Sequence, residues 1–228
     1  MYGTTLNRAS LLIFSILLMA CQQAAAQAGS LDTTFGTGGI FSTSFTQPAA
    51  ADNAIAIQSD GKIIVGGLIA LSTGGGEAAL LRLNTNGTLD SSFGTGGIVT
   101  SNFGNAGGAI VFSIAIQPNG QIVAAAEGSF FDAGSVGRFN TDGSVDTTFG
   151  TSGFAVSNSI NSAAGATNAM VLQPNGSIVV TGGGFMGRYT STGQVDTTFG
   201  TNGVAILNPP PQPAAKQDRK NRPISSVP

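Results

Sequence analysis

A ten-residue motif occurs four times along this 228-residue chain, and no other feature constrains the fold as strongly. The copies are LDTTFGTGGI at residues 31–40, LDSSFGTGGI at 89–98, VDTTFGTSGF at 145–154 and VDTTFGTNGV at 195–204. Their aspartates lie 58, 56 and 50 residues apart. A second pattern, AIAIQSDGKIIVGG in its first copy, occurs three times between these motifs. The chain therefore contains three full repeating units plus one extra motif with its strand.

Each unit has the sequence pattern of β structure. Asp60-Gly61, Asn119-Gly120 and Asn175-Gly176 each separate two apolar runs, which predicts β-hairpins closed by type I′ turns. We expect four strands per unit: a short one after the motif, the hairpin pair, and a strand that carries Arg82 in the first unit. Tandem four-stranded units of this length are typical of β-propeller blades, and a parallel β-helix is the second choice. The prediction is an all-β, β-propeller-like domain over residues 29–207.

Two features of the strands predict how the sheets pack. Residues 54–57 (AIAI) are apolar on both faces of a strand, so we expect sheets to cover that strand on both sides. The second strand of each hairpin ends in small residues, as in Val65-Gly66-Gly67. Small side chains at matching positions predict a close approach of backbones near an axis.

The motif beginning Asp-Thr-Thr-Phe-Gly, together with the hairpin pattern ending in Gln-x-Asn-Gly or Gln-x-Asp-Gly, resembles the delta-60 repeat family. The resemblance extends over nearly all of residues 30–207. It implies bacterial tandem repeats with a propeller-like fold, an exported setting and an uncharacterised function. It implies no catalytic residue.

The two ends of the chain are expected to lie outside this domain. Residues 1–28 have the composition of a signal peptide, with Arg8 before a ten-residue apolar run and a small-x-small cleavage site at residues 26–28. Alternatively, residues 1–20 are removed and Cys21, the last residue of a lipobox-like LMAC sequence, carries a lipid. Residues 208–228 begin with prolines, contain four of the nine basic residues, and predict a disordered tail. The expected location is the periplasm, the outer membrane as a lipoprotein, or the exterior as a secreted protein.

Composition argues against several functional classes. Between Gly29 and Leu207 ten acidic residues face four basic ones, a net charge of −6, so we expect no nucleic-acid partner. The chain has no histidine, and Cys21 is its single cysteine, which excludes Ser–His and Cys–His nucleophiles and the usual zinc sites. We expect no catalytic residue and no cofactor. Calcium is an alternative that the acidic core suggests, although each motif offers only one carboxylate.

An arginine precedes the motif aspartate by eight residues in three units: Arg82 and Asp90, Arg138 and Asp146, Arg188 and Asp196. The constant spacing predicts a structural ion pair that positions the return strand in every unit. A ring of charged sites around a channel is the alternative. Asp32 has no such arginine and would need a partner from elsewhere.

Length variation identifies a candidate contact surface. The distance from the hairpin glutamine to the arginine is 24, 21 and 15 residues in the three units, so insertions concentrate in one loop after the hairpin. Variable insertions in repeat proteins often lie on the binding face. In the second unit this loop contains Phe130, Phe131 and Asp132, whose aromatic rings either contact a partner or plug the loop.

These observations favour a non-catalytic, exported binding or scaffolding protein that contacts another protein or a cell surface. The alternative is an extracytoplasmic hydrolase or sugar-binding protein with a pocket on the propeller axis or loop face. Membrane contact is expected only through a lipid on Cys21. Three blades are too few to close a ring, so we expect self-association into a homodimer or larger assembly, with the strand at residues 204–207 pairing across the join. A truncated array is the rival explanation.

Overall fold

The computed structural model describes residues 29–42, 50–70, 76–103, 108–128, 135–157, 160 and 167–207. The chain divides into two compact units, Met1–Ser42 and Thr43–Pro228, and each is considered by itself. The expected signal peptide with Cys21, the contact loop at Phe130–Asp132 and the basic tail at 208–228 all lie outside the described residues.

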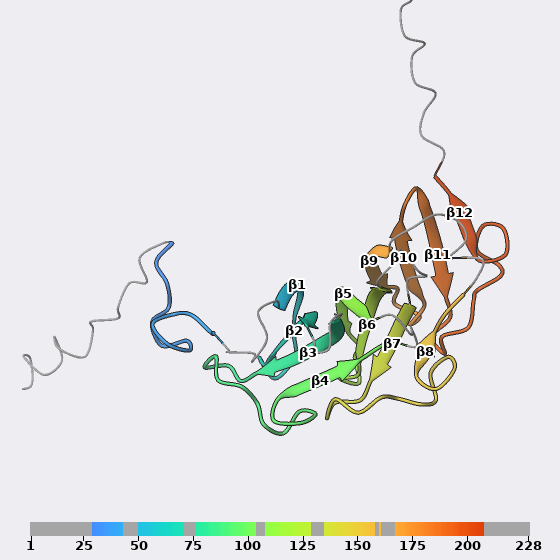
Figure 1. Cartoon of the computed structure of the whole chain (residues 1–228). Helices are drawn as coiled ribbons and strands as arrows, with labels where there is room; N and C mark the ends of the chain where they lie inside the picture. Colours follow the sequence, from blue (N-terminus) through green and yellow to red (C-terminus); the bar gives the residue numbers. More distant parts are fainter. Residues whose placement is uncertain are drawn as a thin grey trace, which may run out of the picture. The chain divides into compact units, whose positions relative to one another are not determined.

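The larger unit contains three antiparallel sheets of four strands each, as Figure 1 shows. The first sheet has β1 (Ala50–Ile57), β2 (Ile63–Ala70), β3 (Gly76–Leu83) and β4 (Ile98–Ser101). The second has β5 (Ala109–Ile116), β6 (Ile122–Gly128), β7 (Ser135–Phe139) and β8 (Phe154–Ala155). The third has β9 (Thr167–Leu172), β10 (Ile178–Gly182), β11 (Phe185–Tyr189) and β12 (Val204–Ile206). This is the all-β, propeller-like arrangement of tandem four-stranded blades that the repeats predict.

The grouping of strands differs from the expectation in one respect. The strand that follows each motif pairs with the preceding arginine-bearing strand: β4 pairs with β3, β8 with β7, and β12 with β11. The expected unit placed this strand before the next hairpin. Likewise β12 pairs with β11 in its own sheet, and the expected pairing of this strand across a join between copies stays a prediction. The motif is therefore a connection within a sheet, and the extra motif is the first one, at residues 31–40.

The hairpin turns also differ from the predicted type. In the Asp60-Gly61 pair only the glycine has a positive φ, of 82°, whereas a type I′ turn needs two such residues. Gly61 N–H donates to the Gln58 carbonyl, and Gln58 N–H donates to that of Lys62. This is a three-residue loop, and the Asp60 carboxylate stabilises it by accepting the backbone N–H of Lys62 at 3.1 Å. The other two hairpins have the same backbone hydrogen bonds.

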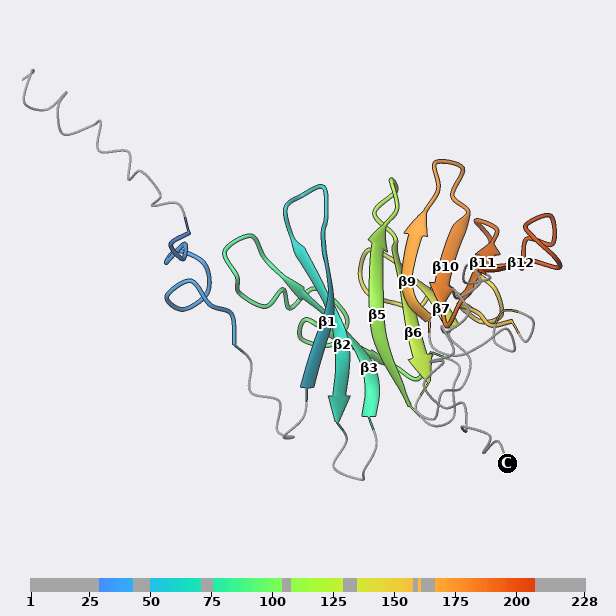
Figure 2. The same ribbon diagram turned by 90° about the horizontal axis from the view of Figure 1, so that it is seen from above.

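The first strands of the sheets, β1, β5 and β9, contact one another in sequence, and Figure 2 shows the sheets side by side. A Cβ placed on Gly66 of β2 would lie 2.6 Å from Ile114 Cδ1 of β5. The absence of a side chain at Gly66 therefore allows the close approach that the small residues predict.

Two apolar cores separate the three sheets. The core between the first and second sheets includes Ile64, Leu80, Val111 and Ile122, and the core between the second and third includes Val123, Val136, Ile178 and Val180. The second sheet is thus covered on both faces. The first sheet is not: the Ile55 and Ile57 side chains of β1 are each 69% exposed. The expectation that this strand is covered on both sides was wrong for its isoleucine face.

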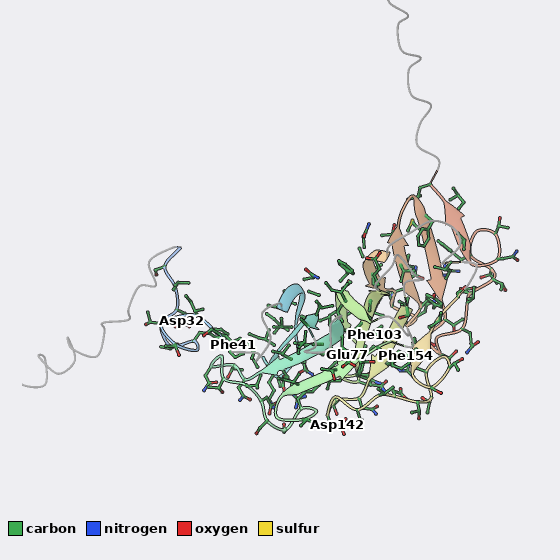
Figure 3. The ribbon with its side chains drawn as sticks, viewed as in Figure 1. Asp32, Phe41, Glu77, Phe103, Asp142 and Phe154 are labelled. Carbon is green, nitrogen blue, oxygen red and sulfur yellow. The ribbon has the colours of Figure 1, made fainter. Side chains whose placement is uncertain are left out.

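In each connection between two sheets, one apolar side chain packs against strands of the sheet that follows. Phe103, after β4, packs on Phe139 and Phe154 with ring centroids 5.6 Å away, and Figure 3 labels Phe103 and Phe154. A Cβ on Gly137 would lie 2.9 Å from the Phe103 ring, and one on Gly187 would lie 2.8 Å from Ile160. Glycine in these strands therefore makes the space that the inserted side chain fills.

Candidate functional site

The repeated motif forms a turn organised by its aspartate. In the second motif, Asp90 Oδ1 accepts the backbone N–H of Ser92 at 3.1 Å and its hydroxyl at 2.7 Å. The Phe93 N–H donates to the Asp90 carbonyl at 3.0 Å. Aspartate forms such turns readily because its short carboxylate reaches the backbone two residues ahead. The motif sequence therefore determines this turn locally, in every copy.

Each arginine forms an ion pair with the aspartate eight residues later. Nε donates to the aspartate Oδ2 at 2.7 Å for Arg82 and Asp90, 2.7 Å for Arg138 and Asp146, and 2.8 Å for Arg188 and Asp196. Backbone hydrogen bonds lie beside the pair, since Asp90 N–H donates to the Arg82 carbonyl at 2.8 Å. The ion pair thus joins the third strand of a sheet to the motif.

The guanidinium also covers the phenylalanine of the motif. The Cζ atoms of Arg82, Arg138 and Arg188 each lie 4.7 Å from the ring centroid of Phe93, Phe149 and Phe199, respectively. Phe93 and Phe149 are fully buried. A desolvated cation above a ring adds a favourable electrostatic term to the apolar packing. We refer to the arginine, the aspartate and the phenylalanine of one repeat as an Arg–Asp–Phe cluster.

Two of these clusters reach the next sheet. Arg82 Nη1 donates to the Thr141 carbonyl, 59 residues away, and Arg138 Nη1 donates to the Ser191 carbonyl at 2.9 Å. Gly94 N–H donates to the Asp142 carbonyl at 2.8 Å, and Gly150 N–H to that of Thr192 at 2.9 Å. The cluster is therefore both a turn device and a connection between sheets.

The aspartate has a third partner that its spacing from the arginine did not predict. Lys62 Nζ donates to Asp90 Oδ2 at 2.7 Å, and Gln121 Nε2 donates to Asp146 Oδ2 at 2.8 Å. Both residues directly follow the glycine of their hairpin turn. The third repeat has Ser177 at this position. The position varies between lysine, glutamine and serine, so no constant residue type pointed to it.

These hydrogen bonds keep the aspartates ionised. The hydrogen bond from Lys62, followed by that from the Ser92 hydroxyl, holds the pKa of Asp90 far below its usual value. Burial raises the pKa of Asp146, but hydrogen bonds from Thr148 and Arg138 outweigh burial and lower the pKa to about 2. The arrangement is suited to a fixed negative charge and not to proton transfer near neutral pH.

Asp146→Asn should remove a pH-dependent part of the stability. Because the folded-state pKa of about 2 lies below the ordinary value of 3.8, the carboxylate stabilises the fold above about pH 4, and this contribution is lost as the pH falls towards 2. We expect a loss of about 1–2 kcal/mol at neutral pH and a flatter stability curve between about pH 2 and 4, since nearby solvent weakens the pair. Urea unfolding at several pH values measures both.

Asp196→Asn is the matched control for this experiment, because its ion pair has the same geometry but is more exposed to solvent. The expected loss of unfolding free energy is smaller than for Asp146→Asn. Equal losses for the two variants, or a pH dependence of stability that Asp146→Asn leaves unchanged, would contradict a stabilising role for the buried Asp146 carboxylate.

Asp32 of the first motif forms the same local turn. Its Oδ1 accepts the backbone N–H and the hydroxyl of Thr34 at 3.0 and 2.6 Å, and the hydroxyl lowers the pKa of Asp32. In the part of the chain that the structure describes, no ion pair involves Asp32. The partner that we expected from elsewhere therefore stays a prediction.

An open cleft of about 530 Å³ lies where the first two sheets meet. Its lining includes Thr95, Thr100, Asp142 and Ser144, from the second motif, β4 and the turn after β7. Asp142, labelled in Figure 3, contributes the carboxylate, and its Oδ1 accepts the Ser144 hydroxyl at 2.7 Å. A cleft of this volume is large enough for a small molecule.

Within the described residues, no group of three or more acidic, cysteine or histidine side chains is arranged to hold a metal ion. Over the same ranges, no helix combines the length and the apolar character that a membrane crossing requires.

Comparison with known proteins finds a match to one family model, over two of the repeats. No curated protein matches this chain. A family model described as "Domain of unknown function (DUF5122) beta-propeller" matches residues 58–93 and 117–149. Each match begins at the hairpin glutamine and ends at the buried motif phenylalanine, so it covers strands two and three of one sheet and the start of the motif. Over these two repeats the chain is similar to that β-propeller domain, and its architecture is that of a β-propeller-like repeat protein.

Proposed function

We propose that this chain is an exported, non-catalytic repeat protein of the delta-60 type that binds another protein through the open faces of its sheets. The observation that carries the proposal is the isoleucine face of the first sheet. Ile55 and Ile57 are each 69% exposed, whereas the matching Ile114 and Ile116 pack into the core between the first and second sheets. Large apolar side chains that gather on one exposed face mark an interaction surface.

The Arg–Asp–Phe clusters support the same proposal. Their charged groups hold the motif turns and connect neighbouring sheets, so the repeated polar residues already have a structural role. A repeated structural device in each unit leaves the end faces as the variable, functional part of the protein.

A photo-reactive amino acid placed at Ile57 tests the proposal in the cell that produces the protein. We expect cross-linked protein adducts from Ile57 and none from Thr147, an exposed polar position of the third motif that serves as the control. Mass spectrometry of the adducts identifies the partner. No adduct from Ile57, or equal yields from both positions, would contradict a binding role for this face.

The cleft beside Asp142 favours a second candidate, a small-ligand or sugar-binding role. Its hydroxyl groups and single carboxylate offer hydrogen bonds to a neutral polar ligand. Chemical-shift changes at Thr95 and Ser144 on addition of a neutral disaccharide, absent in Asp142→Ala, would support this candidate over the first.

A further inference from the structure

The two internal junctions between sheets are built from the same contacts, in the same repeat positions. At the first junction, Arg82 Nη1 and Gly94 N–H donate to the carbonyls of Thr141 and Asp142. At the second, Arg138 Nη1 and Gly150 N–H donate to those of Ser191 and Thr192. In both cases the donors belong to one sheet and the acceptors to the turn after the third strand of the next sheet.

The apolar part of each junction repeats as well. Phe93 and Phe149 are fully buried, and each ring lies against a glycine of that same turn in the next sheet. A Cβ on Gly143 would be 2.9 Å from Cε2 of Phe93, and a Cβ on Gly193 would be 2.9 Å from Cζ of Phe149. The turn glycine therefore leaves space for the phenylalanine ring of the preceding sheet. The two carbonyls beside it accept the arginine and glycine N–H groups of that sheet.

The third sheet presents the donor half of a further junction. Arg188 uses Nε and Nη2 within its own repeat, for Asp196 and Thr198, and within the described residues its Nη1 has no carbonyl partner. Gly200 N–H likewise has no acceptor there. Phe199 is only partly buried, and Val171 on the same face is 59% exposed.

The first sheet presents the acceptor half. Its turn after β3 has Thr85, Asn86 and Gly87 where the other sheets have their two acceptor carbonyls and the glycine. In the described residues, neither the Thr85 nor the Asn86 carbonyl accepts an arginine or a motif N–H. Ile55 and Ile57 of β1 complete this face, because their counterparts Met170 and Leu172 pack against the preceding sheet.

We propose that the third sheet of one copy docks on the first sheet of a second copy, head to tail, with the contacts of the internal junctions. Arg188 Nη1 then donates to the partner copy's carbonyl at position 85, and Gly200 N–H donates to that at position 86. Phe199 and Val171 cover the exposed isoleucines and the turn glycine. The inference rests on the proposed binding role and names the partner as a second copy of this chain. Such a contact is heterologous, since two different faces meet.

The first test is the mass of the purified protein as a function of concentration, by sedimentation or light scattering. We expect association that Ile57→Lys and Val171→Asp each weaken at least tenfold in dissociation constant. Val156→Lys changes an exposed apolar residue away from both faces and should have no effect. Unchanged unfolding midpoints show that the variants fold.

Mixing the two variants gives the decisive test. Ile57→Lys leaves the third-sheet face intact and Val171→Asp leaves the first-sheet face intact, so a mixture retains one native junction and should associate although neither variant does alone. A contact between two identical faces would show no such rescue. A mixture that fails to associate would therefore overturn the proposal. In the unsubstituted protein, hydrogen exchange of the Gly200 N–H should slow as the protein concentration rises, because association gives this N–H an acceptor.

A protein that stays monomeric at all concentrations would overturn this inference, whether the faces remain open or are covered from within the chain. If adducts from Ile57 then contain a different protein, the proposed binding function stands without the self-association. The proposed contact is present both in a dimer and in a longer row of copies, so either assembly agrees with the proposal.

Discussion

Gly94→Ser should lower the free energy of unfolding by about 3 kcal/mol or more, one of the two largest losses that we expect from a single substitution. Gly94 has a φ of 55°, a conformation that costs a residue with a side chain about 1–2 kcal/mol. A Cβ there would also overlap the Ile98 carbonyl oxygen and lie 2.5 Å from Val99 Cγ2. The obstacle is backbone, so the motif must open and strain two hydrogen bonds, from Thr95 N–H to Ile98 and from Gly94 N–H to Asp142.

Gly96→Ser is the control, two residues away in the same motif. Gly96 also has a positive φ, of 60°, but no atom lies within 4 Å of a Cβ placed there. Ser152 and Asn202 occupy this position in the third and fourth motifs with φ of 53° and 51°. We therefore expect only the cost of this backbone conformation, a loss of about 1–2 kcal/mol. Urea denaturation of the two variants with equal m-values measures the difference. Similar losses would show that backbone strain, and not steric overlap, determines the effect.

Phe149→Ala should cost about 3–5 kcal/mol, the usual range for a fully buried phenylalanine. The ring lies between the second and third sheets, below the Arg138 guanidinium and against Gly193. Its removal leaves a cavity at a junction and leaves the cation with no ring to cover. Thermal or urea unfolding followed by circular dichroism gives the loss. Phe149→Leu keeps most of the volume and should cost less than about 1.5–2 kcal/mol, so it provides a variant that still folds.

Phe199→Ala is the matched control for the second prediction. Phe199 has the same ion pair and the same 4.7 Å distance to its arginine, but it is only partly buried. We expect a loss of about 1–2 kcal/mol in dilute protein. A loss as large as that of Phe149→Ala would mean that the ring contributes within its own motif and not through burial between sheets.

The spacing of the arginine and the aspartate was sufficient to predict which residues lie together. The seven residues between them contain a strand end and a tight turn, and a tight turn returns the chain to the strand that it leaves. The carboxylate, the hydroxyl two residues later and the phenylalanine follow from the motif itself, through a local turn. The third partner, at Lys62 and Gln121, comes from 28 and 25 residues away along the chain, and its identity changes between repeats. Sequence spacing gave no signal for it.

The turn type illustrates a related limit. Asp60-Gly61 between two apolar runs predicts a hairpin at the correct place, but the same dipeptide fits both a two-residue and a three-residue loop. The register of β1 on β2, in which Ile57 faces Ile63, decides in favour of the longer loop. Packing of the two strands determines that register.

The sequence by itself determined the number of repeats, the positions of the strands and hairpins, and the local turn around each motif aspartate, because these depend on residues close together along the chain. Only the tertiary structure decided that β4 joins the sheet of β3 and not the next one, since a short apolar strand can pair equally well with either neighbour. It also decided that Arg82 reaches Thr141 and that Ile55 stays exposed while Ile114 is covered. Matching residues have the same local sequence, and their burial depends on whether another sheet lies against them.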